Sequence, residues 1–298
     1  MYPWIDFFYF KIPTFGLMVA TAFLVCHYFL KKDFIKYKYD PIIVDDIVFY
    51  SAISAIVGSK IYYIIETSSY NLVFQNIKNI FSSIFAANFS NAILELQSFG
   101  SGLVFNGGFI CALVFITIYL KKKSLNFFSI ADLIAPYILL GHGIGRIGCF
   151  LVGDDYGIPT NLPWAISFKE GIPVSTIATF LNQYSFLNYS FSDLEMYLVE
   201  GSKSYITVHP TQIYEMILYF IGFYIIKSLY FKYKSNVGFI FSCYLIYGGL
   251  SRFMVEFLRT NERYMFNFSS AQFISIALIL IGIYLSLNSL NKNNYGKN

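Results

Sequence analysis

Charged side chains stand inside the most apolar stretches of this sequence, and one group of them has the spacing of a binding site. His142, Arg146 and Cys149 are separated by four and three residues, so a helix would present all three on one face. A guanidinium is planar, stays charged at any relevant pH and binds a phosphate through two hydrogen bonds. The six glycines between residues 141 and 157 would leave room for such an anion beside Arg146.

Each of these charges needs a partner or a function, because an ionisable side chain in the hydrocarbon costs at least about 2.5–3.5 kcal/mol on insertion scales. In the simpler interpretation, the glycines only pack helices and Arg146 pairs with Asp154 or Asp155. That interpretation does not explain why an arginine, a histidine and two aspartates occur in one short stretch. We therefore favour an anion-binding site.

A second charged row contains Arg252, Glu256 and Arg259, which would share a face of one helix at i, i+4 and i+7. On a surface helix such a row is only a salt bridge worth a few tenths of a kcal/mol (about 0.2–0.5). Within a membrane it is more plausibly a polar wall that lines a cavity. One carboxylate cannot neutralise two guanidinium groups, so we expect an anion from elsewhere to complete the balance.

Two further segments carry weaker signals. His209 precedes Pro210, which is favourable at a helix start, and Glu215 follows one to two turns inside, where a carboxylate is normally avoided. His209 alone is as often a capping or packing residue as a catalyst. Asn106 lies in a glycine-rich stretch, residues 100–108, whose backbone N–H groups are donors for a phosphate.

The composition shows what kind of protein must position these residues. The chain has 298 residues, of which 56% are hydrophobic and 13% charged, against about 25% charged in a typical globular chain. This excludes a disordered or coiled-coil protein and argues against a soluble one. The net charge of +4 is too small and scattered for a nucleic-acid-binding surface. Four separated cysteines and three histidines on different segments give no metal-ligand spacing, so neither a metal nor another cofactor is implied.

Hydropathy windows of about 20 residues predict an all-α polytopic membrane protein with seven transmembrane helices. Two regions lie outside these helices: residues 152–210 form the longest loop, and residues 70–99 have the short apolar bursts of an interfacial or re-entrant segment. The predicted spans are residues 13–30, 42–65, 102–120, 130–151, 211–231, 236–257 and 271–289.

The lysines and arginines predict the orientation of these spans. Twelve of the 21 follow odd-numbered spans, six lie on the opposite side and three fall inside spans. The positive-inside rule then places the N-terminus outside, the C-terminus in the cytoplasm and the loop 152–210 outside. Arg146 and Arg252 come to lie near the outer ends of their spans, at the depth of lipid headgroups. We therefore expect a phospholipid-phosphate site open to the outer leaflet and to the bilayer.

Three motifs give the chain a resemblance to the prolipoprotein diacylglyceryl transferase family. They are residues 145–157 (GRIGCFLVGDDYG), residues 209–215 (HPTQIYE) and residues 252–259 (RFMVEFLR). Additional matches are Phe15–Met18, Gly58–Lys60 and Phe105–Gly108. The resemblance covers nearly the whole chain in order and implies one integral-membrane transferase domain, residues 1–298, in the bacterial cytoplasmic membrane.

By this resemblance, the protein would transfer the diacylglyceryl group of phosphatidylglycerol to the thiol of the lipobox cysteine in prolipoprotein signal peptides. This is the first step of bacterial lipoprotein maturation and releases glycerol phosphate. Arg146 and Arg252 would be the catalytic residues that handle the phosphate. We expect the further substrate-binding residues to be Asn106, His142, Cys149, Asp154, Gly157, His209 and Glu256.

Three positions depart from the pattern of the family and leave the general base open. Asn106 and Cys149 stand where histidine and asparagine are common, and Phe15 replaces a tyrosine. Asn106 cannot take a proton, so His142, His209 and Asp154 remain candidates. Cys149 is not expected to be a nucleophile, because the reaction needs no covalent enzyme intermediate.

Other classes of protein remain open at this stage. A transporter or lipid-binding protein would use the same arginines to bind an anion without chemistry, and an inactive homologue would keep only the fold. An intramembrane protease is disfavoured, because neither HExxH nor Gly-x-Ser-Gly occurs.

Overall fold

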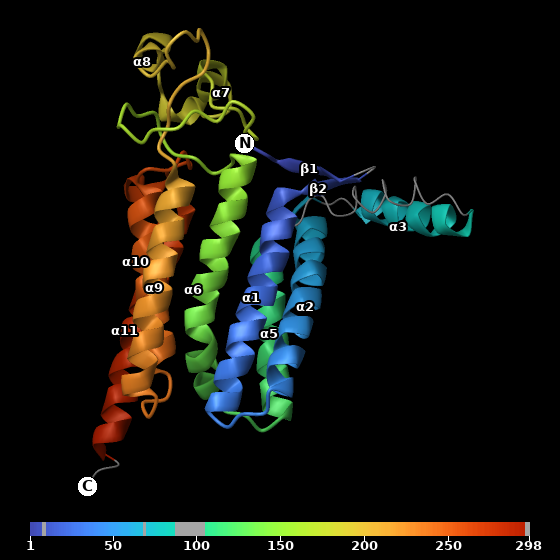
Figure 1. Ribbon diagram of the computed structural model, residues 1–298, viewed down its shortest axis with the longest axis vertical. Helices are drawn as coiled ribbons and strands as arrows, with labels where there is room; N and C mark the ends of the chain where they lie inside the picture. Colours follow the sequence, from blue (N-terminus) through green and yellow to red (C-terminus); the bar gives the residue numbers. More distant parts are fainter. Residues whose placement is uncertain (8–9, 68–69, 87–104, 296–298) are drawn as a thin grey trace. The chain divides into compact units, whose positions relative to one another are not determined.

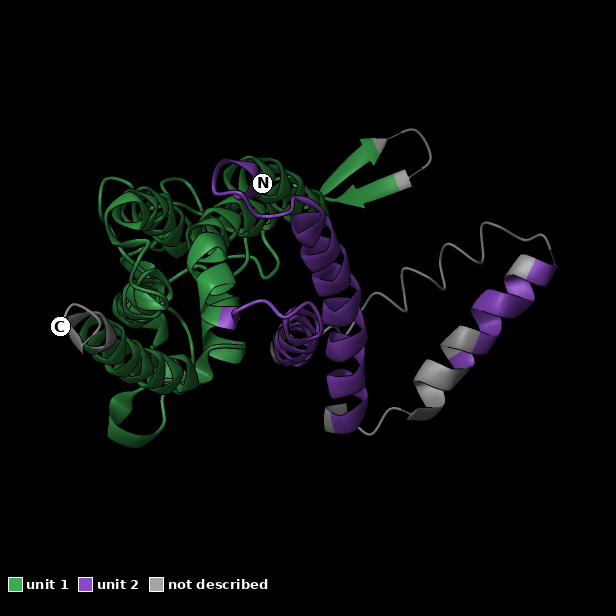
Figure 2. Cartoon of the chain, turned by 90° about the horizontal axis from the view of Figure 1, so that it is seen from below, with its two compact units in different colours: residues 1–33, 128–298 green, residues 34–127 purple. Residues whose placement is uncertain are grey.

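The computed structural model of the protein describes the whole chain except residues 8–9, 68–69, 87–104 and 296–298. Two compact units can be distinguished, one formed by residues 1–33 and 128–298 and the other by residues 34–127 (Figure 2). The protein is mostly helical, as expected. The first unit also contains an antiparallel hairpin of β1 (Trp4–Phe7) and β2 (Phe10–Pro13), which the prediction of an all-α protein missed.

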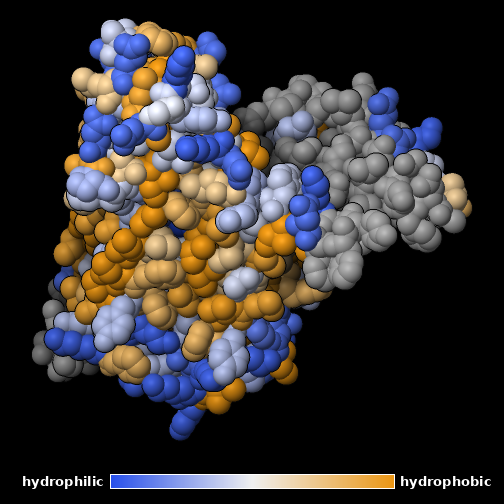
Figure 3. Space-filling view, turned by 45° about the horizontal axis from the view of Figure 1, so that its top comes forward, coloured by the Kyte–Doolittle hydropathy of each residue, from blue (hydrophilic) through white to orange (hydrophobic). Residues whose placement is uncertain are grey.

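A helix forms over each of the seven stretches predicted to cross the membrane (Figure 1). These helices are α1 (Thr14–Lys36), α2 (Ile42–Thr67), α5 (Phe105–Lys122), α6 (Phe127–Val152), α9 (Thr211–Tyr233), α10 (Phe239–Glu256) and α11 (Ser270–Tyr295). Within the described residues, five of them, α1, α2, α6, α9 and α11, are long and apolar enough to cross a membrane. In the view of Figure 3, hydrophobic side chains cover much of the face shown, with hydrophilic residues above and below them.

In the first unit, α10 packs against α9 and α11. Glycines allow the α10 and α11 backbones to approach closely. A Cβ atom at Gly249 would lie 2.9 Å from the carbonyl oxygen of Ser275, and a Cβ atom at Gly282 would lie 2.9 Å from the carbonyl oxygen of Ser242. Small residues at helix contacts are typical of membrane bundles, where close packing replaces the hydrophobic effect between helices.

Asp132 of α6 fixes the start of α10. Its Oδ2 accepts a hydrogen bond from Gly238 N at 2.6 Å, and its Oδ1 accepts one from Phe241 N at 2.7 Å. The first N–H groups of a helix have no partner within the helix, and a carboxylate there also compensates the positive end of the helix dipole. The contact therefore ties together the two helices that carry Arg146 and Arg252.

A partly buried ionic contact connects α1, α6 and α9. The Tyr137 hydroxyl donates to Asp33 Oδ2 at 2.6 Å, and Lys227 Nζ lies 3.0 Å from the same oxygen. Lys227 also donates to the Tyr137 hydroxyl. Pairing the two charges avoids the cost of leaving either alone among apolar side chains.

The predicted external loop was residues 152–210; α6 includes Val152, and residues 153–210 fold around their own hydrophobic core. They include the short helices α7 (Ile177–Asn182) and α8 (Phe191–Glu195), together with isolated β-bridges. The core consists of Tyr156, Phe168, Ile177, Phe180, Leu194, Ile206 and Val208. We call this region the loop domain. Its two ends are joined, because Gly157 N donates to the His209 carbonyl oxygen at 2.9 Å.

In the second unit, α2 and α5 are in close contact. A Cβ at Gly58 would lie 2.5 Å from the Gly107 carbonyl oxygen, so the backbones touch at this point. The Tyr119 hydroxyl donates to Asp46 Oδ2 at 2.6 Å, which gives this acidic residue of the second predicted span a polar partner. The unit also contains α3 (Tyr70–Phe85), a helix with apolar residues on one side, which covers the first part of the predicted interfacial segment. Residues 87–99 of that segment lie outside the described residues.

Candidate active site

Glu215 of α9 joins the two arginines that the sequence singled out. Its Oε1 accepts a hydrogen bond from Arg252 Nη1 at 2.5 Å, and its Oε2 pairs with Arg146 Nε. Arg146 comes from α6 and Arg252 from α10, so three helices meet at one carboxylate whose side chain is 1% exposed. The structure thus brings the two guanidinium groups together.

Asp155 and Arg259 extend this cluster. Asp155 Oδ2 lies 2.8 Å from Arg146 Nη1, and Asp155 Oδ1 lies 2.6 Å from Arg259 Nη2. Arg252 Nη2 is 3.1 Å from Glu256 Oε2, and Arg259 Nε is 3.6 Å from the same oxygen. Among the described residues, three guanidinium groups therefore meet three carboxylates, and we call these six residues the charged cluster.

This balance corrects an expectation from the sequence. The anions that complete the Arg252–Glu256–Arg259 row come from the protein itself, as Glu215 and Asp155. The row also does not lie on one continuous helix, because α10 ends at Glu256. A turn in which Arg259 N donates to the Glu256 carbonyl oxygen at 3.2 Å brings Arg259 back to the cluster.

The accessibility of the charged cluster is uneven. The side chain of Asp155 is 41% exposed, and those of Arg252 and Arg146 are 24% and 17% exposed. Glu256 is fully buried, and its Oε1 accepts further hydrogen bonds from Asn261 Nδ2 at 2.6 Å and Ser269 Oγ at 2.8 Å. Solvent or a ligand can therefore reach the cluster at Arg146, Arg252 and Asp155.

Asp154 and Cys149 lie beside Arg146. Burial, together with the charge of Asp155, raises the pKa of Asp154 to about 6, even though the Cys149 thiol donates a hydrogen bond to it. Asp154 Oδ1 is buried and has no hydrogen-bond partner among the described residues, which leaves an acceptor atom available. For Asp155 burial alone would raise the pKa, but Arg259 and Arg146 outweigh it and hold that pKa well below its usual range.

The same residues have the spacing of a small metal site. Cys149 Sγ and carboxylate oxygens of Asp154 and Asp155 lie within 4.8 Å of one another. Arg146 Nη1, however, is 3.5 Å from Cys149 Sγ and donates to Asp155 Oδ2. The guanidinium thus already supplies the positive charge that these ligands would share, and the donor set does not fit a metal ion.

His209 belongs to a hydrogen-bonded chain at the start of α9. Trp164 Nε1 can only donate, so the Tyr214 hydroxyl accepts from it at 2.7 Å. The same hydroxyl lies 3.2 Å from His209 Nδ1, within hydrogen-bonding distance. Burial lowers the pKa of His209, which favours its neutral form.

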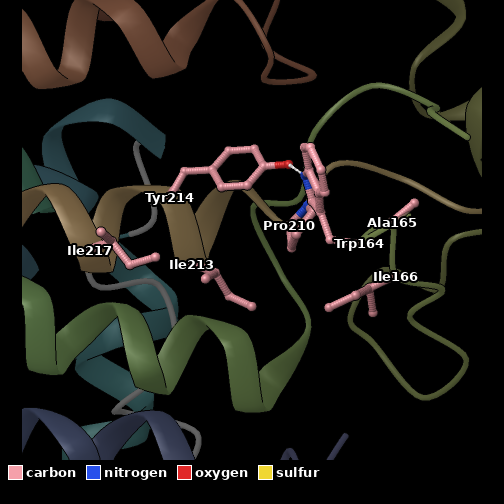
Figure 4. Close-up of a pocket in the computed structure, with 7 residues that line it drawn as sticks. All are labelled: Trp164, Ala165, Ile166, Pro210, Ile213, Tyr214 and Ile217. Carbon is pink, nitrogen blue, oxygen red and sulfur yellow. Dashed lines mark hydrogen bonds between the residues drawn. The ribbon is translucent and has the colours of Figure 1, made fainter. Parts of the chain in front are cut away.

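An apolar groove of about 530 Å³ lies next to this chain (Figure 4). Trp164, Ala165 and Ile166 of the loop domain line one side of it. Residues at the start of α9 line the other side, namely Pro210, Ile213, Tyr214 and Ile217. Its few polar groups are already paired, so the groove can receive an apolar group.

Gly157 is explained by close packing. A Cβ at this position would lie 2.3 Å from the Leu258 carbonyl oxygen and 2.8 Å from the Cβ of His209. Ile158 N also donates to the Leu258 carbonyl oxygen at 2.8 Å. Gly157 therefore holds the loop domain, the start of α9 and the segment after α10 in register around the charged cluster.

Two predicted residues, His142 and Asn106, remain to be placed. His142 is one turn before Arg146 on α6, with its ring 5.4 Å from the ring of Tyr219. Asn106 is in the first turn of α5, in the second unit, and its side chain lies outside the described residues.

The site residues predicted from the sequence did not include Glu215, Asp155 or Arg259. Glu215 carried a usable signal, since a carboxylate inside an apolar helix implies a partner. Asp155 was foreseen only as an alternative partner of Arg146. The return of Arg259 to the cluster depends on the end of α10, which the residue spacing does not reveal.

Fold and site together define a class: a helical multi-pass membrane protein with a partly accessible arginine–carboxylate cluster between its helix bundle and a folded loop domain. The chain belongs to the prolipoprotein diacylglyceryl transferase family, whose sequence model matches residues 4–288.

Individual relatives agree with this assignment. Each of the following is named phosphatidylglycerol–prolipoprotein diacylglyceryl transferase. The protein from Clostridium tetani is 31% identical over 277 residues, covering 92% of each chain. That from Finegoldia magna is 32% identical over 81% of this chain and 77% of its own. One from Prochlorococcus marinus is 32% identical over 95% of this chain and 91% of its own.

Proposed function

We propose that this protein transfers the diacylglyceryl group of phosphatidylglycerol to the thiol of the lipobox cysteine in a prolipoprotein signal peptide. Family membership makes the chain a diacylglyceryl transferase, and its relatives are named for these two substrates. The observation that carries the proposal in the structure is the convergence of Arg146 and Arg252 on Glu215. It supports the proposal, because two guanidinium groups, which are well suited to binding phosphate, lie side by side at a point that a ligand can reach.

In this reaction, the cysteine sulfur attacks a glycerol carbon of the lipid, a C–S bond forms and the C–O bond to the phosphate breaks. The electron pair of the broken bond leaves with the phosphate oxygen, so glycerol phosphate departs with an additional negative charge. Arg146 and Arg252 would stabilise that charge, and one such donor is typically worth about 10²–10³ in rate. The ion pairs of Arg146 use Nε and Nη1, so its Nη2 group can donate to a lipid phosphate.

We assign the proton of the attacking thiol to Asp154. A free thiol has a pKa near 8.5, so attack needs a base or a nearby cation. Asp154 has an available acceptor oxygen, and its pKa of about 6 keeps it ionised at neutral pH. His209 is less suited, because its Nδ1 is already hydrogen-bonded to Tyr214. His209 would instead contact the substrate through Nε2.

The other proposed site residues contribute to this arrangement in different ways. Cys149 keeps Asp154 in place, and Glu256 holds Arg252. Gly157 provides the close packing around the charged cluster. For Asn106 and His142 we retain the expectation of substrate binding, with Asn106 as a hydrogen-bonding partner of the lipid headgroup.

The membrane arrangement that we propose has seven spans, with the loop domain outside and the C-terminus in the cytoplasm. The five apolar helices support a multi-pass protein, and α5 and α10 would complete the seven. An amphipathic helix such as α3 is suited to lying flat on the external surface of the cytoplasmic membrane. The family match extends over both units, which supports a single transferase domain in the bacterial cytoplasmic membrane.

The test is incubation of the purified protein with labelled phosphatidylglycerol and a lipobox peptide. A transferase yields a lipid-modified peptide and glycerol phosphate, and a peptide with serine in place of the acceptor cysteine remains unmodified. A transporter, a lipid-binding protein or an inactive homologue would bind the lipid and give no modified peptide. That outcome would reject the proposed reaction.

A further inference from the structure

The three carboxylates of the charged cluster differ in how easily they can leave it. Glu215 is 1% exposed and pairs with arginines of two helices. Glu256 is fully buried and is held by Asn261 and Ser269 as well. Asp155, in contrast, is 41% exposed and sits in the loop domain just after α6. It is the carboxylate whose own charge can turn into solvent.

The backbone of Asp155 is held independently of its side chain. Thr211 Oγ1 donates to the Asp155 carbonyl oxygen at 2.6 Å, and Gln212 Nε2 donates to the preceding carbonyl oxygen of Asp154. The first turn of α9 thus anchors the chain, while the carboxylate reaches across to Arg146 and Arg259. Rotation of the side chain alone would release Arg146 Nη1 and Arg259 Nη2 from this carboxylate.

We propose that Asp155 is a resident counter-anion, whose carboxylate neutralises Arg146 and Arg259 and gives way when the phosphate of the lipid, handled by Arg146 and Arg252, enters the charged cluster. This inference rests on the proposed function, because it concerns the same site. The charges match: a phosphodiester carries one negative charge, as does the Asp155 carboxylate. The exchange therefore leaves the charged cluster neutral. In a largely buried site an uncompensated charge would be energetically costly.

The same exchange opposes product retention. Cleavage of the C–O bond converts the diester into a monoester, whose charge approaches −2 at neutral pH. With Asp155 turned away, such a product would bind the three arginines more strongly than the substrate does. The return of the Asp155 carboxylate to Arg146 and Arg259 competes with the product and promotes its release. Asp155 is thus a specificity-determining residue that favours a singly charged phosphodiester over a phosphomonoester.

The experiment compares Asp155→Asn and Asp155→Gly with the wild-type protein. Asn keeps the shape and removes the charge. Gly also removes the side chain at a residue whose φ of 59° lies in the left-handed region, where glycine is unstrained, so this variant is expected to fold at least as well. Glu170→Gln, an exposed residue of the loop domain, is the control with the same change in net charge. Equilibrium binding of labelled phosphatidylglycerol and of glycerol phosphate is measured in detergent micelles.

We expect both Asp155 variants to bind phosphatidylglycerol about three- to tenfold more tightly, the range for losing one competing charged contact at a partly exposed site. Binding of glycerol phosphate should tighten by a larger factor, and the control should match the wild type. Unchanged or weaker binding of both ligands by the Asp155 variants would overturn the proposal. Equal tightening of both ligands would overturn the part concerning product release. Because binding is measured without turnover, failure of the transferase reaction itself would be seen separately, in the wild-type assay with the lipobox peptide.

Discussion

Glu215 Oε1 and Arg252 Nη1 are 2.5 Å apart, although the two residues belong to different helices and to sequence motifs 37 residues apart. The second oxygen of the same carboxylate pairs with Arg146 of a third helix. This shared contact makes Glu215 the residue on which the geometry of the two arginines depends. It also accounts for a carboxylate inside an otherwise apolar helix.

Removing the charge of Glu215 should therefore destabilise the protein. In Glu215→Gln, Arg146 and Arg252 lose their common counter-ion, and breaking a buried ion pair typically costs about 3–5 kcal/mol. We expect a clearly lower melting temperature in detergent, measured by thermal unfolding, together with loss of transferase activity. Glu195→Gln, on the exposed side of α8, is the control and should melt like the wild type. A stable Glu215→Gln protein would show that the cluster does not depend on this carboxylate.

The activity should depend on pH through Asp154. Burial raises the pKa of Asp154 to about 6, and only its ionised form can accept the thiol proton. We therefore expect the rate to fall as the pH decreases through about 6 and to be independent of this group above it. Asp155 should not contribute to this decrease in rate, because its pKa is held well below the pH range tested.

The check is the pH profile of kcat/KM for the wild type and for Asp154→Asn. The variant should be much slower, and its residual rate should lack the acid limb. A variant that keeps the same limb would assign the titration to another group and would remove Asp154 as the base.

Two glycines of the same motif should respond differently to a methyl group. A Cβ at Gly157 would lie 2.3 Å from the Leu258 carbonyl oxygen, whereas one at Gly145 meets no described atom within 4 Å. We expect Gly157→Ala to lower the melting temperature and the activity, because the backbone of two segments must shift. Gly145→Ala should keep the wild-type melting temperature. Equal stability of the two variants would contradict the packing assigned to Gly157.

Cys149→Ser should retain most of the activity. Cys149 donates to Asp154 and lies 3.5 Å from Arg146 Nη1, and a serine hydroxyl can make the same donation. Cys149→Ala removes this donor and should slow the reaction more than serine does, as measured by the initial rate of peptide modification. Complete loss of activity in Cys149→Ser would instead indicate a thiol that takes part in the chemistry.

Much of the fold follows from the sequence, because a run of apolar residues near 20 in length predicts a helix whatever surrounds it. A helix lies in each of the seven predicted stretches, five of these helices are long and apolar enough to cross a membrane within the described residues, and Arg146 and Arg252 meet at Glu215. The hairpin of residues 4–13 was missed, since short strands at the edge of a bundle leave little periodicity.

The composition of the charged cluster was harder to predict. Its neutral balance arises from tertiary contacts between α6, α9, α10 and the loop domain, which spacing along one helix cannot reveal. Arg259 is an example: helical spacing placed it on the face of Arg252, but it reaches the cluster by a turn after the helix has ended. Asp155 likewise could be foreseen as a partner of Arg146 and not as a bridge to Arg259.

The central claim is that Arg146 and Arg252 act on the phosphate of the lipid during transfer. The most direct test is the single-turnover rate of peptide modification from labelled phosphatidylglycerol by Arg146→Lys and Arg252→Lys, which keep the charge that Glu215 needs and lose the planar fork. Lys203→Ala, an exposed residue of the loop domain, is the control. We predict that each arginine variant is inserted and folded like the wild type but at least about 100-fold slower. Wild-type rates in both arginine variants, and in the corresponding alanine variants, would contradict the account.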